Sequence, residues 1–374
     1  MKKKLLIITS IWTPYSHARF TAIAENSNID LIVFFQNPGS KHRKWKVAEE
    51  NGPYKSKFLR NIGIPISSNT AFTFNFNYDV YKNMQKCKPD LILTDGWDSF
   101  ATLAALIYAR LYGKEIVLIC ESTIHEDSLI RKISIPYVRF ILRFFNGFIS
   151  TGTASEEYLR FLGVGKRVER FYNTVDVDFF SQHGRLGLSE KQHVRERIGI
   201  GHDSKVIMFS GRLVAIKCVH LLIKAFLMVK KEFPKTTLLV AGYGPEEQKL
   251  KKMAGVNSGI NFLGHQGIDK IPKLYGISDI LVLPSISETW GAVVNEAMAC
   301  GCAIIVSDKC GCAKDLIQEN GVIVKGGSLD SLIKALRELL SSEERLNQMK
   351  SKSLKVIQRF RLENLVKEVS FFQT

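Results

Sequence analysis

Short apolar runs alternate along the chain with longer segments whose apolar positions recur at helical spacing. In the first half these runs are Lys4 to Thr9, Leu31 to Phe35, Leu91 to Thr94, Ile116 to Cys120 and Gly147 to Ser150. Runs of this length with few polar residues are typical of strands that are buried on both faces. Strands that alternate with helices predict a parallel, doubly wound sheet.

The same alternation restarts after residue 200. Its apolar runs are Val206 to Ser210, Thr237 to Ala241, Asn261 to Leu263, Ile280 to Leu283 and Ala303 to Ser307. A single core rarely keeps growing beyond about 250 to 300 residues, and the chain has 374. The sequence therefore predicts an α/β protein with two Rossmann-like, doubly wound domains.

The segment Asp176 to Asp203 separates the two patterns. It is rich in Gly, Ser, His and charge and has no long apolar run, which favours an exposed connection between domains. We predict an N-terminal domain over residues 1–175, a hinge over 176–203 and a C-terminal domain over 204–355. The last segment, 356–374, has apolar residues at helical spacing and is expected to pack back toward the N-terminal domain.

The charge balance narrows the range of partners. Lys and Arg number 52 against 36 Asp and Glu, a formal net charge of +16. Such an excess attracts anionic lipid surfaces, nucleoside diphosphates and nucleic acids. No nucleic-acid reader module is recognisable, so nucleic acid is not expected as a partner.

The apolar runs also bear on the cellular compartment. Leu5 to Ile8 is too short for the core of a signal peptide, and no run reaches the roughly 18 residues of a membrane span. Seven scattered cysteines favour free thiols in a reducing compartment. We expect a cytoplasmic protein, either soluble or peripheral on the inner face of the cell membrane.

The segment PSISETWGAVVNEAMACGCAIIVSD, from Pro284 to Asp308, carries the most specific pattern. A strand ends at Pro284, a loop carries Glu288, and the following helix carries Glu296 eight positions later. Gly291 and the start of the helix offer backbone amides to sugar hydroxyls or a diphosphate. The Glu296 carboxylate, about two turns into the helix, can accept two hydrogen bonds from a ribose diol.

The E-x7-E spacing, followed by A-M-A-C-G, resembles the signature of the retaining GT-B glycosyltransferases of family 4. Other segments resemble this family in the expected order: Gly211, Arg212 and Leu213 with Lys217; Gly242, Tyr243, Gly244 and Pro245; Phe262, Leu263 and Gly264; Asn173, Val175 and Asp176. Cys218 stands where the family commonly has glycine. The resemblance covers roughly residues 170–340 and is looser over the first domain.

The resemblance implies a hexosyltransferase with two domains that face each other across a cleft. The N-terminal domain, 1–175, is then the acceptor domain, and the C-terminal domain, 204–355, is the nucleotide-sugar donor domain. It implies transfer of a sugar, with retention at the anomeric carbon, from a UDP- or GDP-linked donor to a glycan or lipid-linked acceptor. The expected setting is bacterial cell-surface polysaccharide biosynthesis. The nucleotide sugar is a co-substrate, and no separate cofactor is expected.

The resemblance also assigns roles to residues. Arg212 and Lys217 are expected to hold the donor diphosphate, so that no metal ion is needed. Glu288 and the amides around Thr289, Trp290 and Gly291 are expected to orient the donor sugar.

Two further sets of residues complete the expected site. The turns at Gly242, Tyr243 and Gly244 and at Gly264 are expected to bring the backbone near the nucleotide. His125, in the loop after Ile116 to Cys120, is the candidate for a histidine close to the donor sugar and the acceptor.

Two other classes of function remain open at this stage. A non-catalytic sugar-nucleotide-binding protein would keep Arg212, Lys217 and Glu296, and a sugar-nucleotide epimerase can have the same architecture. The presence of Glu288 and His125 favours a transferase. Cys300, Cys302, Cys310 and Cys312 lack the C-x2-C spacing of a zinc site and are interpreted as packing thiols.

Two basic segments allow two interpretations each. The region Gln36 to Asn77 is either a mobile acceptor-side insertion or a solvated loop. Arg131, Lys132, Arg139 and Arg143 lie among apolar residues at helical spacing. This helix either touches an anionic inner-membrane surface or packs in the core with charged ends.

Overall fold

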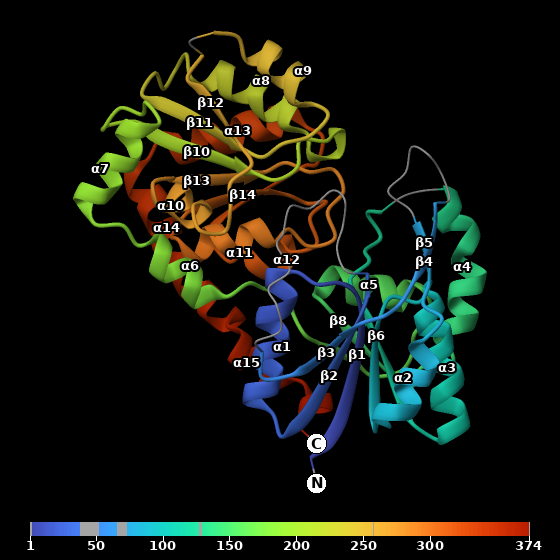
Figure 1. The fold of residues 1–374 in the computed structure, drawn as a ribbon. Helices are drawn as coiled ribbons and strands as arrows, with labels where there is room; N and C mark the ends of the chain where they lie inside the picture. Colours follow the sequence, from blue (N-terminus) through green and yellow to red (C-terminus); the bar gives the residue numbers. More distant parts are fainter. Residues whose placement is uncertain (1, 38–51, 66–72, 127–128, 257, 374) are drawn as a thin grey trace. The chain divides into compact units, whose positions relative to one another are not determined.

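The computed structural model of the protein describes residues 2–37, 52–65, 73–126, 129–256 and 258–373. The chain forms two compact units, which are described separately (Figure 1). Unit 1 comprises Met1–Asn173 and Leu362–Thr374, and unit 2 comprises Thr174–Arg361. Half of the region Gln36 to Asn77, including Lys41, Arg43 and Trp45, lies outside the described residues.

Unit 1 contains a seven-stranded parallel sheet in the order β3-β2-β1-β6-β7-β8-β9. The strands are β1 (Lys3–Ile11), β2 (Ile29–Asn37), β3 (Lys55–Phe58), β6 (Leu91–Asp95), β7 (Glu115–Cys120), β8 (Gly147–Ser150) and β9 (Val168–Arg170). The helices are α1 (Pro14–Asn26), α2 (Val80–Cys87), α3 (Phe100–Tyr112), α4 (Leu129–Leu142), α5 (Thr153–Phe161) and α15 (Leu362–Glu368), followed by the short η3 (Ser370–Phe372). A separate antiparallel hairpin joins β4 (Ile62–Pro65) to β5 (Thr73–Phe76).

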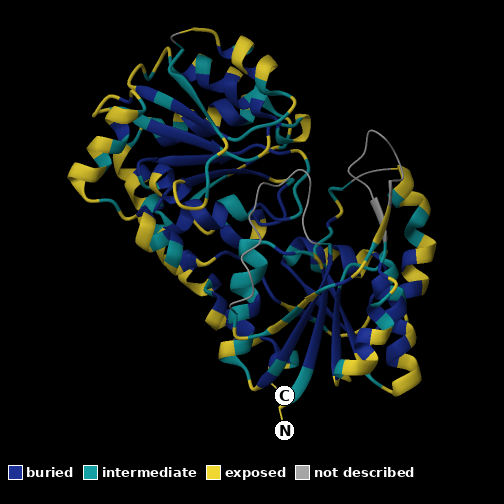
Figure 2. Ribbon diagram, in the orientation of Figure 1, coloured by how far each residue is buried: buried dark blue, intermediate teal, exposed yellow. Residues whose placement is uncertain are grey.

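The central strands of unit 1 are buried on both faces (Figure 2). In β1 the run from Leu5 to Ile8 is almost completely shielded from solvent. Helix α1 begins directly after β1. Thr13 is its N-cap and forms a capping box with Ser16, and Pro14 is the first helical residue. The chain therefore turns from strand to helix within two residues of the sheet edge.

The segment after Leu362 returns to unit 1, where α15 packs beside α1 (Figure 1). The carboxylate of Glu169, on β9, accepts a hydrogen bond from the backbone N–H of Ser370 at 2.7 Å. The ring of Phe372 packs edge-on against Phe171, with 5.3 Å between ring centres. Unit 1 is therefore built from two segments that are far apart in the sequence.

Unit 2 contains a six-stranded parallel sheet in the order β12-β11-β10-β13-β14-β15. The strands are β10 (Lys205–Ser210), β11 (Thr236–Ala241), β12 (Ile260–Gly264), β13 (Ile280–Leu283), β14 (Ala303–Ser307) and β15 (Gly321–Val324). The longer helices are α6 (Val177–Gly184), α7 (Leu188–Arg197), α8 (Val219–Val229), α9 (Glu247–Ala254), α10 (Ile271–Gly276), α11 (Ala292–Ala299), α13 (Leu329–Leu340) and α14 (Glu343–Val356). The short ones are η1 (Ala215–Lys217), α12 (Ala313–Leu316) and η2 (Ile357–Phe360).

The two sheets confirm the predicted fold class of two Rossmann-like, doubly wound domains. The cleft expected between them stays a prediction. Among the residues that the structure describes, no helix is both long and apolar enough to cross a lipid bilayer.

The segment 176–203, for which we predicted a hinge, contains two helices that pack within unit 2. Helix α6 contacts α10 and α11, and α7 contacts α10. Helix α7 is polar on every side, and Arg195 is its one buried residue. The Arg195 guanidinium donates to the backbone carbonyls of His202 at 2.8 Å, Ser204 at 3.1 Å and Ile277 at 3.1 Å. Hydrogen bonds to carbonyl oxygens, rather than an apolar stripe, attach this helix to unit 2.

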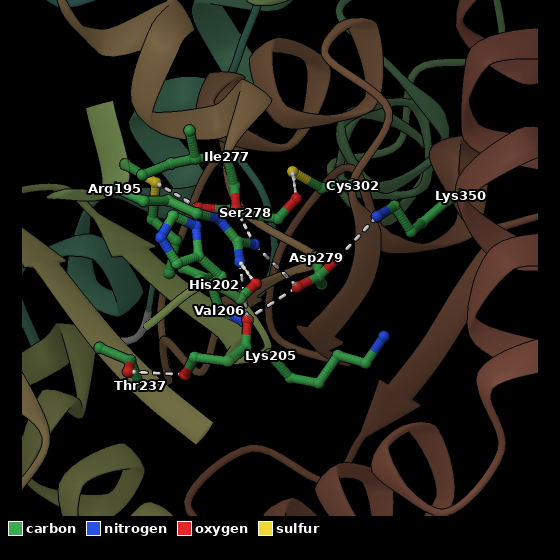
Figure 3. A network of polar contacts seen from close by, with 12 residues as sticks. Arg195, His202, Lys205, Val206, Thr237, Ile277, Ser278, Asp279, Cys302 and Lys350 are labelled. Carbon is green, nitrogen blue, oxygen red and sulfur yellow. Dashed lines mark hydrogen bonds and ion pairs between the residues drawn. The ribbon is translucent and has the colours of Figure 1, made fainter. Parts of the chain in front are cut away.

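A buried carboxylate, Asp279, joins three parts of unit 2 at the amino ends of β10 and β13 (Figure 3). Its oxygens accept from the Val206 backbone N–H at 2.9 Å and from Lys350 Nζ at 2.7 Å. Arg195 Nη2 lies 3.9 Å from Asp279 Oδ2. Burial acts to raise the pKa of Asp279, but Lys350, the Val206 amide and Lys205 outweigh burial and hold that pKa below its ordinary value. The carboxylate thus links α7, the sheet and α14.

Replacement of Asp279 by Asn should destabilise unit 2 by about 3 kcal/mol, because two cations then lose their counter-charge. This value is at the low end for breaking a buried ion pair, since Lys350 keeps partial access to water. Thermal unfolding followed by circular dichroism measures the effect. Lys352, on the same helix as Lys350, forms an exposed ion pair with Glu319, and Lys352→Gln should change stability by less than about 1 kcal/mol. Equal effects of the two substitutions would contradict this account of Asp279.

Candidate functional site

The predicted donor-side residues of unit 2 gather at the carboxyl edge of its sheet, where the direction of winding reverses. From β10 the chain crosses to its neighbour β11, whereas from β13 it crosses the opposite way to β14. Because such crossovers are right-handed, their helices lie on opposite faces of the sheet. The loops after β10 and β13 therefore diverge, and this is where ligands bind in doubly wound folds.

An ion pair joins these two loops. Lys217, in the loop after β10, contacts a carboxylate oxygen of Glu288, in the loop after β13, through its Nζ atom. The two side chains are 14% and 18% exposed, so both can be reached from solvent. The structure therefore brings together two of the residues that the sequence assigned to catalysis, although 71 positions separate them.

Arg212 adds a second positive charge beside this pair. Its side chain is exposed, and it lies close enough to Lys217 to lower the pKa of the lysine. Burial is the main cause that lowers the pKa of Lys217, to about 8, and the Arg212 charge acts in the same direction. Lys217 is therefore charged at neutral pH.

Backbone hydrogen bonds hold the Glu288 loop in place. The Ile286 N–H donates to the Ile216 carbonyl at 2.9 Å, which ties this loop to the Lys217 loop. The Glu288 N–H donates to the Lys309 backbone carbonyl at 3.2 Å, and the Gly311 N–H donates to the Glu288 carbonyl at 3.0 Å. The segment 309–312, which the sequence analysis treated only as a source of packing thiols, thus supports Glu288.

The predicted glycine turns form close backbone contacts. The Gly242 N–H donates to the Gly264 carbonyl at 2.8 Å, and the Leu213 N–H donates to the Tyr243 carbonyl at 2.9 Å. A Cβ atom at Gly242 would lie 1.8 Å from the Gly211 carbonyl oxygen, and one at Gly244 would lie 2.3 Å from the Leu213 carbonyl oxygen. Only glycine fits at these two positions. Tyr243 packs edge-on against His265, 5.4 Å between ring centres.

Gly291, at the N-terminus of α11, also has a backbone conformation that requires glycine, with φ near +105°. The neighbouring indole of Trp290 is buried, and its Nε1–H donates to Asn295 Oδ1 at 2.9 Å. The side chain of Trp290 therefore belongs to the interior of unit 2. The contribution predicted for residues 289–291 rests on their backbone.

Glu296 lies just over one turn into α11, closer to its start than the two turns that the sequence indicated. The residue is buried, and its Oε2 accepts a hydrogen bond from the Tyr275 hydroxyl at 2.7 Å. Tyr275 comes from α10, and no spacing in the sequence pointed to it. This hydrogen bond fixes the orientation of the Glu296 carboxylate.

Cys218 occupies the N-cap of α8 in a left-handed conformation, with φ of 51°. Glycine adopts this conformation with no steric cost, which explains why glycine suits the position. Among the described residues, no group of three or more His, Cys, Asp or Glu side chains is arranged to hold a metal ion.

His125 belongs to unit 1, in the loop between β7 and α4. Glu126 fixes this loop, since its Oε2 accepts from the Thr123 N–H at 3.2 Å and lies 2.6 Å from Arg131 Nη1. Arg131 also donates from Nε to the Tyr158 hydroxyl at 3.0 Å. The role of His125 stays a prediction.

Replacement of Gly244 by Ala should lower the melting temperature strongly, because the added Cβ would collide with the backbone of Leu213 and force the two turns apart. Gly201→Ala is the matched control, since a Cβ there meets nothing within 4 Å. Differential scanning calorimetry of both variants tests the contact. Equal melting temperatures would show that the turns can separate freely.

Comparison with known proteins identifies the protein family to which this chain is similar. Residues 190–356 match the family model described as glycosyl transferases group 1, and residues 24–179 match that of glycosyltransferase family 4. The structure superposes on the crystal structure of the Anabaena protein HepE in complex with UDP, with a TM-score of 0.79 and 18% identity, covering 99% of both chains. This likeness identifies the GT-B fold.

Curated relatives agree with this assignment. An uncharacterized glycosyltransferase of Methanocaldococcus jannaschii is 25% identical over 91% of this chain and 90% of its own. A GDP-mannose-dependent alpha-(1-6)-phosphatidylinositol monomannoside mannosyltransferase of Mycolicibacterium smegmatis is 27% identical over 53% of each chain. The chain spans less than half the length of six further curated relatives that it matches.

The two family matches together span most of the chain, and the protein belongs to the group 1 glycosyltransferases of family 4. Both family models describe glycosyltransferases, which is the enzyme class that the sequence predicted.

Proposed function

We propose that the protein transfers a hexosyl group, with retention, from a nucleoside diphosphate sugar to a glycan or lipid-linked acceptor in cell-surface polysaccharide synthesis. The observation that supports this most is the Lys217–Glu288 ion pair beside Arg212, at the point where the winding of unit 2 reverses. It combines two cations for a diphosphate with one carboxylate for sugar hydroxyls. Membership of a transferase family argues against the epimerase and silent-binder alternatives.

Cleavage of the bond between sugar and phosphate leaves extra negative charge on the departing diphosphate. Positive charge fixed in advance at that point lowers the barrier. In our proposal Arg212 contacts two phosphate oxygens at once, and Lys217 exchanges part of its contact with Glu288 for the diphosphate. Glu288 is then placed to accept hydrogen bonds from hydroxyls of the donor sugar, while Glu296 binds the ribose.

We further propose that the proton of the acceptor hydroxyl passes to the departing phosphate on the same face of the sugar. The new bond joins the acceptor oxygen to the anomeric carbon, and the electron pair of the broken bond stays on the phosphate oxygen. No protein base and no metal ion is required in this scheme, because Arg212 and Lys217 carry the compensating charge.

Purified protein should be stabilised by either UDP or GDP and their sugar conjugates, and EDTA should leave this stabilisation unchanged. Solved structures of HepE contain UDP and UDP-glucose, and the mycobacterial relative is named as GDP-mannose-dependent, so both bases belong in the screen. Arg212→Gln and Lys217→Gln should each weaken nucleotide affinity about tenfold or more, since a hydrogen bond to a charged group contributes about 1.5–3 kcal/mol. Lys252→Gln, an exposed change on α9, should have no effect. Stabilisation that requires a divalent metal would contradict the metal-free scheme.

The same assay has a pH dependence. Because the pKa of Lys217 is lowered to about 8, the lysine loses its charge as pH rises through that value, and nucleotide affinity should fall. Lys217→Arg should flatten this profile, because arginine stays charged. An unchanged profile in Lys217→Arg would assign the titration to another group.

Helix α4 supports the peripheral membrane location. Leu129, Ile130, Ile133, Tyr137 and Phe140 are between 48% and 82% exposed, and in a regular helix they fall within one arc of about 100°. The exposed Lys132 and Arg143 lie along one edge of this stripe. An apolar stripe with a basic edge suits an anionic bilayer surface. Of the other basic residues, Arg131 is bound to Glu126, and Arg139 donates to the Phe161 carbonyl at 3.1 Å.

The protein should float with vesicles of phosphatidylcholine and phosphatidylglycerol, and high salt should weaken the association. Ile130→Gln combined with Ile133→Gln should abolish flotation, and Lys132→Gln combined with Arg143→Gln should reduce it. The control is Ile107→Gln with Leu111→Gln, another exposed apolar pair, on α3, which should leave flotation intact. Equal binding of all variants would exclude α4 as the docking surface.

A further inference from the structure

Buried hydrogen bonds connect the loop after β13 with both ends of unit 2. The Trp290 indole N–H donates to Asn295 Oδ1 at 2.9 Å, and Asn295 Nδ2 donates to Thr174 Oγ1 at 3.3 Å. The Thr174 hydroxyl in turn donates to the backbone carbonyl of Phe360 at 2.8 Å. Thr174 is the first residue of unit 2, and Phe360 lies one residue before its end. We refer to these four residues as the Asn295 network.

The direction of each hydrogen bond in the Asn295 network is fixed by the chemistry of its two ends. An indole N–H can only donate, and a backbone carbonyl can only accept. Asn295 therefore presents its oxygen to Trp290 and its amide nitrogen to Thr174, and the Thr174 hydroxyl proton points to Phe360. No member of the network is more than 3% exposed, so bulk water offers no substitute for a lost partner. The four residues have one way to form all three hydrogen bonds at once.

Stability alone does not account for polar groups in this position. Burial of an amide and a hydroxyl costs free energy, which their hydrogen bonds largely offset. Apolar side chains of the same shape can fill such a space with nearly equal stability. A buried polar network does, however, fix one relative arrangement of the segments that it joins. Here those segments are the loop at residues 288–291, the start of unit 2 and its end.

The Asn295 network holds the loop at residues 288–291 from the interior of unit 2. The Trp290 carbonyl accepts from the Cys312 N–H at 3.1 Å, while its indole donates to Asn295. Both the backbone and the side chain of Trp290 are thereby held, directly before Gly291, the N-cap of α11. Asn295 thus helps to fix the backbone amides that are proposed to orient the donor sugar.

Thr174 and Phe360 lie in the two segments through which the chain connects unit 2 to unit 1. The chain enters unit 2 at Thr174 and leaves it after Arg361. Within unit 2, α6, α11 and η2, which ends at Phe360, pack against one another. The Asn295 network therefore reaches both connecting segments from a single position on α11.

We propose that Asn295 and Thr174 are positioning residues of the transfer reaction. When the donor sugar binds the loop at residues 288–291 and orders it, the Asn295 network orders the two connecting segments at the same time. Neither residue contacts the substrate, and each acts through Trp290 or Phe360. This role rests on the function proposed above and adds to it the residues that link the donor site to the segments leading to unit 1.

Hydrogen exchange of the whole protein, followed by mass spectrometry, tests this link. UDP, GDP, UDP-glucose and GDP-mannose are the ligands. In the wild type, a sugar nucleotide that binds should slow exchange about fivefold or more in peptides that contain Thr174 or Phe360. The bare nucleotide should slow it less, because the loop is proposed to contact the sugar. Equal slowing by UDP and UDP-glucose, or by GDP and GDP-mannose, would exclude the loop as the origin of the effect.

Substitutions at Thr174 separate a positioning role from a contribution to stability. Thr174→Val keeps the shape of the side chain but removes the hydroxyl, so the ligand should still bind but no longer slow exchange near Phe360. Thr174→Ser keeps the hydroxyl and should retain the effect. Ser353→Ala, the matched control, removes another fully buried hydroxyl of unit 2, which accepts from Asn320 Nδ2 at 3.3 Å, and should leave the effect unchanged. If Thr174→Val fails to fold, Trp290→Phe decides, because it removes the donor at the other end of the network and keeps an aromatic ring.

The outcomes distinguish the positioning role from the proposed function. If none of the four ligands binds the wild type, the proposed function is wrong. If a sugar nucleotide binds but does not slow exchange near Thr174 or Phe360, or if the slowing persists in Thr174→Val, the Asn295 network has no positioning role and the proposed function is unaffected. Loss of the slowing in Ser353→Ala as well would assign it to the general stability of unit 2.

Discussion

Backbone hydrogen bonds between neighbouring loops are the constraint on which the carboxyl edge of unit 2 depends. They lie in the loops that follow the strands and run between Gly211 and Ala241, Leu213 and Tyr243, Gly242 and Gly264, Ile216 and Ile286, and Glu288 and Lys309. Each contributes only about 1 kcal/mol net. Together they fix every loop by its neighbour, so Lys217 and Glu288 meet without any direct sequence relation.

The opposite edge of the same sheet is organised differently. There the buried charges of Asp279, Arg195 and Lys350 are paired with each other and with backbone groups. At the carboxyl edge, by contrast, Arg212, Lys217 and Glu288 keep access to solvent. Charge that is neutralised internally holds the domain together, and charge that remains accessible is available to a ligand.

Strands that are apolar on both faces could be predicted closely from the sequence. The bounds of β8, β13 and β14 coincide with the predicted runs, because burial requires an uninterrupted apolar segment. The missed elements lack that signal. Strand β3, with the sequence KSKF, alternates exposed and half-buried residues at the sheet edge, and α7 has no apolar face.

The residues of the candidate site likewise divide into those that the sequence identified and those that it missed. Motif spacing identified Arg212, Lys217 and Glu288, because their neighbours in sequence carry the pattern. Tyr275 was not identified, since it meets Glu296 only when distant segments fold together. Local spacing contains no information about such partners.

The order in which the two units can form during synthesis follows from the return of Leu362–Thr374 to unit 1. Domains generally fold as they leave the ribosome, the first one first. Here the sheet of unit 1 emerges early but lacks α15 and the hydrogen bond from Ser370 to Glu169 until residues 362–373 are made. Unit 2 is continuous and can complete its fold before then. The nascent chain therefore finishes its second domain before its first, and the surface that later receives α15 stays uncovered in the meantime.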